Sequence, residues 1–171
     1  MFCPALESFA FMLTFTERLP PRDTASLPPP SAVLFSLSLT AGERARSRYR
    51  LESPEGFALC FRLPRGTILQ DGDFVRAENG EIVQIFAKPE PVITVTAHSP
   101  HLLLKAAYHL GNRHVELEIA PDYLRLAPDP VLQAMLEGLG LEITEEIAPF
   151  KPEIGAYQHY HELEESGRGQ D

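Results

Sequence analysis

Cysteine is scarce in this 171-residue chain, which carries only Cys3 and Cys60. The two residues form no CxxC pair, so the sequence signals neither a thiolate zinc site nor a disulfide framework. A reducing compartment is the default for such a chain, and we expect a cytoplasmic protein.

Long hydrophobic runs are also missing. No uninterrupted apolar run approaches the roughly 20 residues that a membrane helix requires, so we expect no membrane association. The apolar start MFCPALESFAFML lacks a basic region, contains Glu7 and leads to no small-residue cleavage site. It therefore does not have the features of a secretory signal.

Positive charge is in the minority, with 15 Lys and Arg against 24 Asp and Glu and a net charge of −9. This balance argues against a nucleic-acid partner, because phosphate contacts require clustered Lys and Arg. Residues 131–171 alone hold nine carboxylates against Lys151 and Arg168. The C-terminal end is therefore an acidic region that attracts cations.

Catalytic motifs are absent as well, since the chain contains no GxSxG, HExxH, Walker or GxGxxG sequence. A metal-dependent hydrolase would need an open metal position and a positioned general base. No carboxylate stands at a motif spacing beside His114, the histidine that we consider as a candidate metal ligand. We therefore expect a protein that is not an enzyme.

The first half of the chain has the pattern of an all-β domain. The proline-rich residues 20–30 predict a loop, and we expect regular structure to begin only after it. From Ala32 to Ala87, short alternating runs are separated by turn signals, of which Asn79-Gly80 is a strong hairpin signal. These features predict a compact all-β domain, either a small barrel or a sandwich.

The second half alternates strands and helices, and the boundary is expected near residues 88–90. Ser99-Pro100 and Asp129-Pro130 are helix-start signals, and Gly111 is expected to end the first helix in the left-handed conformation. The predicted order is strand 91–97, helix 101–110, strands 115–119 and 123–127, helix 131–140 and strand 141–147. This β-α-β-β-α-β order is typical of a ferredoxin-like domain, so the fold class is α+β. Beyond Lys151 we expect a mobile polar tail.

All six histidines lie in this second half, and neutral imidazole is a common ligand of nickel, zinc and copper. His159 and His161 form an HxH pair whose rings would lie on the same side of an extended chain; two incidental histidines in a solvated tail are an equally open interpretation. His114 follows the end of the first helix, where an ordinary surface role is the more common one. His109 near the helix end is a weaker candidate ligand, and we prefer the interpretation that the helix dipole favours a histidine there.

Four arginines alternate with other residues at Arg44, Arg46, Arg48 and Arg50. On a strand this spacing would place them on one face. Such a face could bind an anion or a partner, although a solvated strand face is the more common explanation.

The stretch AAYHLGNRHVELEI at residues 106–119 closely resembles the signature of the UreE family, the nickel chaperones of urease maturation. Further segments resemble that family in the same order, at residues 12–20, 39–51, 63–73, 131–143 and 148–157. The resemblance therefore covers nearly everything from Met12 to Tyr157.

The resemblance implies a homodimer that binds Ni²⁺ and delivers it to the urease maturation complex, where the GTPase UreG receives it. His114 would bind the ion at the dimer interface together with its copy, and His159 and His161 would complete the site. Zn²⁺ or Cu²⁺ would bind the same site, because intrinsic affinities follow the Irving–Williams order. The alternative is a protein-interaction module of that complex in which the histidines are incidental.

The resemblance also implies the division of the chain. Residues 12–88 would form a partner-binding β domain, residues 90–150 the metal-binding and dimerisation domain, and residues 151–171 a metal-binding tail. Residues 1–11 would be an extension without a role, with Met12 as the start. Some members carry extra histidines just before the second helix, where this chain has APDPV at 127–131. That accessory site is expected to be missing, apart from a weak role for Asp129.

Overall fold

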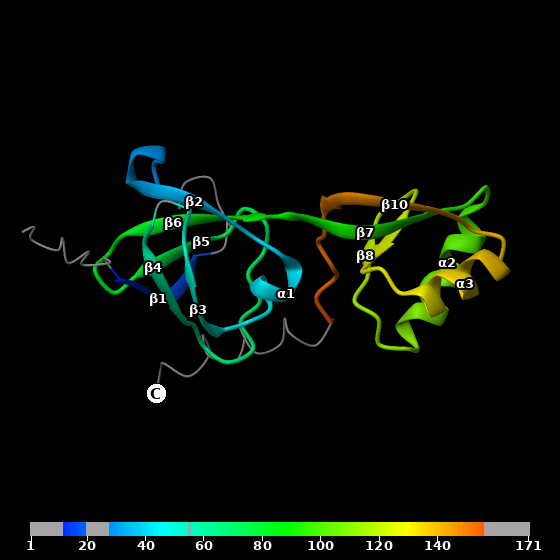
Figure 1. The fold of residues 1–171 in the computed structure, drawn as a ribbon, viewed down its shortest axis with the longest axis horizontal. Coiled ribbons are helices and arrows are strands. Elements are labelled where there is room, and N and C mark those ends of the chain that lie inside the picture. Colours follow the sequence, from blue (N-terminus) through cyan, green and yellow to red (C-terminus); the bar gives the residue numbers. More distant parts are fainter. Residues whose placement is uncertain (1–11, 20–27, 55, 156–171) are drawn as a thin grey trace, which may run out of the picture. The chain divides into compact units, whose positions relative to one another are not determined.

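The computed structural model describes residues 12–19, 28–54 and 56–155 (Figure 1). The chain divides into two compact units between Pro89 and Glu90. Each unit has its own sheet and its own hydrophobic core.

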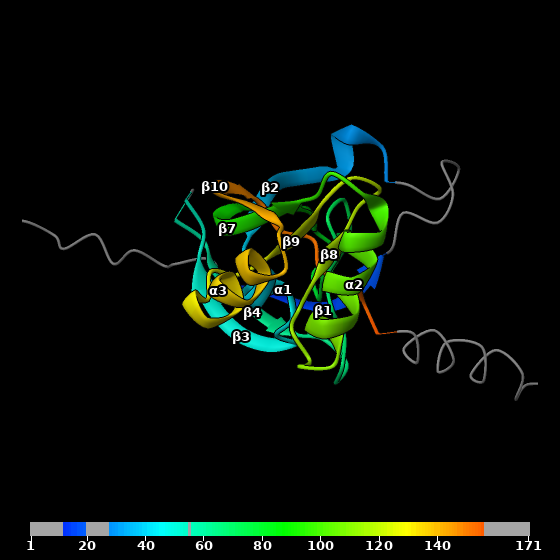
Figure 2. The same ribbon diagram turned by 90° about the vertical axis from the view of Figure 1, so that its right-hand side faces the viewer.

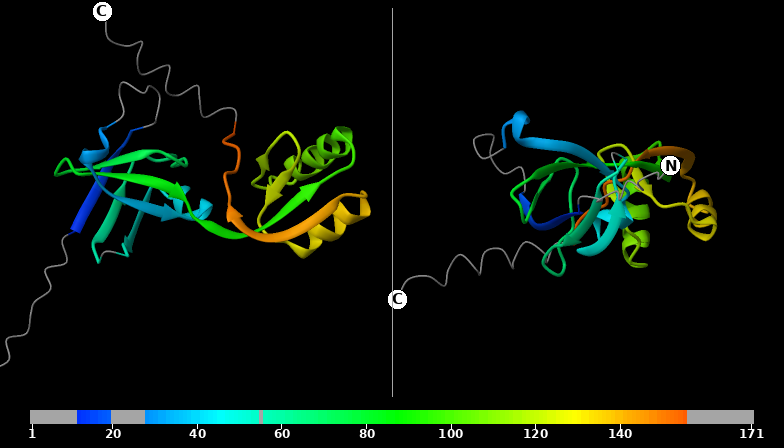
Figure 3. Two further views of the ribbon diagram at one scale, coloured as in Figure 1. Left: turned by 90° about the horizontal axis from the view of Figure 1, so that it is seen from above. Right: turned by 60° about the vertical axis from the view of Figure 1, so that its left-hand side comes forward.

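The first unit is a six-stranded sheet with the order β2-β6-β5-β1-β4-β3. It curls into a half-barrel (Figure 3). A one-turn 3-10 helix, η1 (Pro30–Ala32), and a short helix, α1 (Ala41–Arg44), accompany it. The strands are β1 (Met12–Leu19), β2 (Val33–Leu39), β3 (Arg48–Glu52), β4 (Ala58–Arg62), β5 (Phe74–Ala77) and β6 (Ile82–Ala87).

Alternation along the strands builds the core of this half-barrel. Leu13 and Phe15 of β1 are fully buried, as are Leu59 and Phe61 of β4, because side chains two residues apart on a strand point to the same face. The rings of Phe15 and Phe61 lie 5.1 Å apart between centroids. The all-β prediction for this half is confirmed in the form of one curled sheet.

The expectation that regular structure begins after the proline-rich segment is wrong. Strand β1 precedes that segment and lies between β4 and β5, in the middle of the sheet. The predicted hairpin is confirmed: β5 and β6 pair antiparallel, and Gly80 takes a φ of 89° in their connection. Of the proline-rich segment, residues 20–27 lie outside the described part.

The prediction that four alternating arginines share one strand face is wrong for two of them, Arg44 and Arg46. Thr40 and Glu43 form a capping box that starts α1, and this T-x-x-E pattern is a helix signal in the sequence itself. Arg44 therefore belongs to a helix turn, where it is buried and donates from Nη1 to the Leu69 carbonyl at 3.2 Å. Arg46 precedes the strand, which begins only at Arg48.

The second unit has the ferredoxin-like arrangement that the sequence predicts. Its sheet order is β10-β7-β9-β8, with β9 antiparallel to both β7 and β8. Helices α2 and α3 lie beside each other (Figure 2). The elements are β7 (Pro89–Thr96), α2 (Pro100–Gly111), β8 (Glu118–Ile119), β9 (Leu124–Leu126), α3 (Pro130–Gly138) and β10 (Glu142–Pro149).

Both helices bury apolar faces in one cluster with the sheet. Ile93 and Val95 of β7 meet Leu103 and Leu110 of α2 and Leu136 of α3 in this cluster. The apolar spacing that predicted the helices is thus the spacing of the buried residues. Within the part of the chain that the structure describes, no helix is long and apolar enough to cross a membrane.

Candidate metal centre

The chain leaves α2 through a tight turn that contains His114. The N–H of His114 donates to the Gly111 carbonyl at 2.9 Å, and the N–H of Val115 donates to the Leu110 carbonyl at 3.2 Å. This pair of hydrogen bonds is the Schellman motif, in which the first of the two donors takes the left-handed conformation. His114 has a φ of 55° and is the one non-glycine residue with positive φ among the described residues.

The expectation that Gly111 takes the left-handed conformation is therefore wrong, because Gly111 is still part of α2. Helix α3 ends in the same geometry but with glycine. Gly140 has a φ of 82°, and its N–H donates to the Glu137 carbonyl at 2.9 Å, while Leu141 donates to Leu136 at 3.2 Å. Since a Cβ in this conformation costs about 1–2 kcal/mol, histidine at 114 carries a strain that glycine at 140 avoids.

An exposed apolar stripe on α2 leads to this turn. Leu104 and Tyr108 are 69% and 66% exposed, and their four-residue spacing places them on the same face of the helix. His114 itself is exposed just beyond the end of α2. An imidazole accessible to a metal ion thus stands at one end of an unburied apolar strip.

The two weaker candidates have local structural roles. His109 is half-buried in the last turn of α2, as expected from the helix dipole, and its ring lies edge-on to Tyr108 with centroids 5.5 Å apart. Asp129 is the N-cap of α3, and its Oδ1 accepts from the N–H groups of Val131 and Leu132 at 2.8 and 3.0 Å. Its carboxylate is therefore engaged in capping the helix.

The beginning of the C-terminal segment is hydrogen-bonded to Leu117 and Glu118, which follow His114 closely in the sequence. The Lys151 N–H donates to Glu118 Oε2 at 2.7 Å, and the Glu153 N–H donates to the Leu117 carbonyl at 2.9 Å. Residues 151–153 are therefore held against the sheet rather than being part of a mobile tail. His159 and His161 lie outside the described residues.

Arg125 holds this region together. Its Nη1 donates to the Pro149 carbonyl at 3.1 Å and to Glu118 Oε1 at 3.3 Å, and its Nη2 donates to Glu146 Oε1 at 3.2 Å. Its Nε donates to Thr94 Oγ1 at 3.0 Å. Arg125 lies on β9, and its guanidinium thus joins this strand to β7, β8 and β10.

Across the described residues, no group of three or more His, Cys, Asp or Glu side chains comes together in a form that could hold a metal ion. His114 is the candidate ligand whose side chain is exposed and whose backbone is held by a defined turn.

Glu146 gives this unit a pH dependence that can be measured. Its pKa lies below the ordinary 4.5, first because the Thr94 hydroxyl donates to the carboxylate and further because Arg125 lies beside it. A lowered pKa in the folded state stabilises the fold above about pH 4.5, and this contribution is lost as the pH falls through the lower value. We expect Glu146→Gln to lose less stability than the wild type between pH 7 and pH 3 in urea unfolding. The exposed neighbour Glu145→Gln should follow the wild type; a parallel loss in Glu146→Gln would contradict this role.

The comparisons with known proteins cover both units. Residues 15–88 match the model of the N-terminal domain of the UreE urease accessory protein, and residues 90–171 match that of its C-terminal domain. The chain is 82% identical over 158 residues to the urease accessory protein UreE of Microcystis aeruginosa, covering 92% of this chain and all of that protein.

Other relatives carry the same name. UreE of a Nostoc species is 56% identical over 151 residues, which is 88% of this chain and 99% of that protein. UreE of Burkholderia vietnamiensis is 48% identical over 126 residues, which is 74% of this chain and 63% of that protein. These relatives are named as accessory proteins of urease, and this chain is accordingly an accessory protein and not an enzyme. With both family domains present in order, the chain belongs to the UreE family of urease accessory proteins.

Proposed function

We propose that this protein is a homodimeric nickel carrier that binds Ni²⁺ through His114 and delivers it to the urease maturation complex, through the GTPase UreG. Membership of the UreE family supports a role in urease maturation. The observation that carries the choice of His114 as the metal ligand is its left-handed backbone at an exposed position. Strained backbone persists at sites where function requires a particular side chain.

The exposed stripe on α2 supports a dimer. Leu104 and Tyr108 would be buried against the same face of a second copy, because a two-fold interface pairs a surface with itself. We place the two-fold axis of this dimer beside His114 at the end of the stripe, so that His114 lies near its own copy. One histidine per chain then supplies two imidazole ligands to a single ion.

Chain length allows the last histidines to reach this site. Glu153 is hydrogen-bonded to Leu117, which is three residues, or about 10 Å of extended chain, from His114. His159 is six residues beyond Glu153, and six extended residues span about 20 Å. His159 and His161 therefore complete the coordination in this proposal. Ligands on separate segments can leave the ion one at a time, as transfer to a partner requires.

The intrinsic chemistry of the site does not restrict it to nickel. Imidazole ligands suit zinc and copper as well, and affinity at such a site follows the Irving–Williams order. We therefore expect Zn²⁺ and Cu²⁺ to compete with Ni²⁺ for His114 in the isolated protein. Selection for nickel would come from the maturation partners that receive the ion.

The double variant His159→Ala/His161→Ala tests the contribution of the tail. We expect the nickel affinity per dimer to fall about tenfold, a loss in the range seen when support for a metal ligand is removed, with one ion still bound between the two His114 side chains. Calorimetric titration with nickel measures this. The transfer of nickel to the GTPase, followed with a competing chelator, should become faster because fewer ligands must leave.

The matched control is His98→Ala/His101→Ala, which removes two exposed histidines at the other end of α2. The 12-residue helix is about 18 Å long, so these histidines are too far from His114 to share its ion. An equal loss of affinity in the two double variants would contradict the proposed site.

A further inference from the structure

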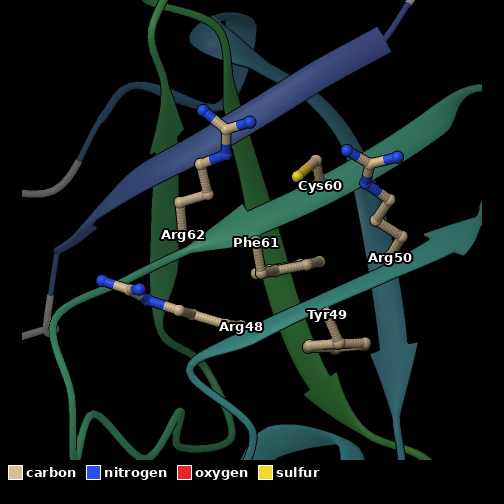
Figure 4. Close-up of a pocket in the computed structure, with 6 residues that line it drawn as sticks. All are labelled: Arg48, Tyr49, Arg50, Cys60, Phe61 and Arg62. Atoms are coloured by element: carbon tan, nitrogen blue, oxygen red, sulfur yellow. The ribbon is translucent and has the colours of Figure 1, made fainter.

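One outward face of the first unit is lined by three arginines. Arg48 and Arg62 are register partners on β3 and β4, and Arg50 is the partner of Cys60. These four residues share a face because side chains alternate along each strand, and Figure 4 shows Cys60 between Arg50 and Arg62. The surface is hollowed by a depression of about 440 Å³. We call Arg48, Arg50 and Arg62 the arginine face.

The arginine face rests on a rigid base. On the opposite side of the same strands, the rings of Tyr49 and Phe61 stack 4.8 Å apart and pack into the core of the half-barrel. Burial raises the pKa of the Tyr49 hydroxyl well above its usual range. The strands that present the three guanidinium groups are thus fixed by buried aromatic packing from behind.

This arrangement opposes folding locally. Like charges directly opposite each other on neighbouring strands are destabilising, and Arg48 faces Arg62 in this way. Among the described residues, no ion pair is present for any member of the arginine face. By contrast, Arg76 pairs with Glu17 at 2.8 Å and Arg18 pairs with Asp73 at 2.6 Å in the same unit.

Protection of a sheet edge explains only part of this face. β3 is the last strand of the sheet, and charged side chains on an edge strand discourage pairing with other proteins. That reason applies to Arg48 and Arg50. It does not apply to Arg62, because β4 is covered by β1 on one side and by β3 on the other. The like-charge pair therefore needs a reason outside the folded chain.

We propose that the arginine face binds an acidic segment of a partner protein in an extended conformation, with carboxylates at alternate positions. Two residues along a strand span about 6.8 Å, so carboxylates two residues apart match the spacing of Arg48 and Arg50. Arginine holds carboxylates in a planar, two-pronged geometry. The bound carboxylates would relieve the repulsion between Arg48 and Arg62.

The distribution of charge favours an acidic protein segment over a long polyanion. Residues 12–88 carry ten basic and nine acidic side chains, whereas residues 90–171 carry five basic and fourteen acidic ones. A nucleic acid carries charge along its whole length and would be repelled by the acidic half of the chain. A short acidic segment needs to meet only the arginine face.

Binding of a synthetic peptide to the full-length protein tests this proposal. The probe is a fluorescent eight-residue peptide with glutamate at alternate positions and threonine between them, and fluorescence anisotropy measures its affinity. We expect Arg48→Gln/Arg62→Gln to weaken binding at least tenfold and to raise the temperature of unfolding. The control Arg65→Gln/Arg76→Gln removes the same charge outside the depression and should change the affinity less than twofold.

Two further measurements separate the arginine face from general charge attraction. A peptide with the four glutamates in one block should bind more weakly than the alternating peptide, because only the alternating one matches the strand spacing. Equal affinities for the two peptides, or equal losses in the two double variants, would overturn the proposal. The proposal would also be overturned if sedimentation showed that the wild type self-associates through this face and that Arg48→Gln/Arg62→Gln does not. The occupant of the face would then be a second copy of the chain. None of the proposed nickel ligands is altered in these experiments.

Discussion

Replacing His114 with glycine is expected to weaken nickel binding at least about a hundredfold while leaving the nickel-free protein as stable as the wild type or up to about 1 kcal/mol more stable. Two ligands per dimer are lost, and the loss of a group that merely supports a metal ligand already costs about 10–100-fold. The gain in stability comes from the backbone, because His114 has a φ of 55° and glycine adopts this conformation without the cost of a Cβ. Calorimetric titration with nickel and urea unfolding at one fixed protein concentration measure the two effects.

Two companion variants separate the ligand from the backbone. His114→Ala removes the imidazole but keeps the Cβ, so it should lose nickel binding without any gain in stability. Gly140→His places a histidine in the same turn at the end of α3, where a Cβ would meet no atom within 4 Å. It should therefore lose about 1–2 kcal/mol through backbone strain alone. Nickel binding that survives in both His114 variants would remove His114 from the site.

The second unit could be predicted from the sequence because its signals are local. Pro100 and Asp129 mark the helix starts, and the apolar periodicity of both helices matches their buried faces. The strand expected at 115–119 shrinks to Glu118–Ile119. Val115 is used in the turn that ends α2, and Leu117 accepts a hydrogen bond from Glu153. The bond from Glu153 comes from a segment about 35 residues away, which a local pattern does not contain.

The first unit was harder to predict for the same reason. β1 pairs in parallel with β4 and antiparallel with β5, so both of its neighbours are distant in sequence. The spacing of the arginines suggested a face, but Arg62 joins it only through the pairing of β3 with β4. Arg44 does not join it, because the capping box of Thr40 and Glu43 starts a helix turn within the alternating pattern.

The sequence indicated His114 as the residue of the candidate site, but it did not indicate the backbone conformation of that residue. Glycine preference indicated Gly111 as the left-handed residue, yet the hydrogen bonds of the last turn place that conformation at His114. A glycine three residues too early does not stop a helix whose next residues can continue the turn. Histidine thus stands at the end of α2 in the position that glycine takes at the end of α3.

Arg125→Ala is expected to destabilise the second unit by about 3 kcal/mol, a typical loss when one partner of a buried pair is removed. The side chains of Arg125 and Glu118 are only 14% and 12% exposed, so Glu118 would be left without its cation. The Pro149 carbonyl would lose its donor as well, which loosens the end of β10. Urea unfolding should show the loss of stability, and nickel titration should show a smaller loss of affinity than in the His114 variants.

A second substitution, at Glu118, can show why Arg125→Ala loses stability. Glu118→Gln removes the negative charge. Its one oxygen can still accept from the Lys151 N–H, which now donates to Oε2 at 2.7 Å, and its amide NH2 can donate to the Tyr123 hydroxyl, which now donates to Oε1 at 2.8 Å. If the uncompensated charge dominates, Glu118→Gln should recover part of the stability lost in Arg125→Ala, as a double-mutant cycle measures. Lys105→Ala removes one exposed cation from α2 and should stay within about 0.5 kcal/mol of the wild type. A cycle with no coupling would mean that Arg125 acts through Thr94, Glu146 and Pro149 and not through Glu118.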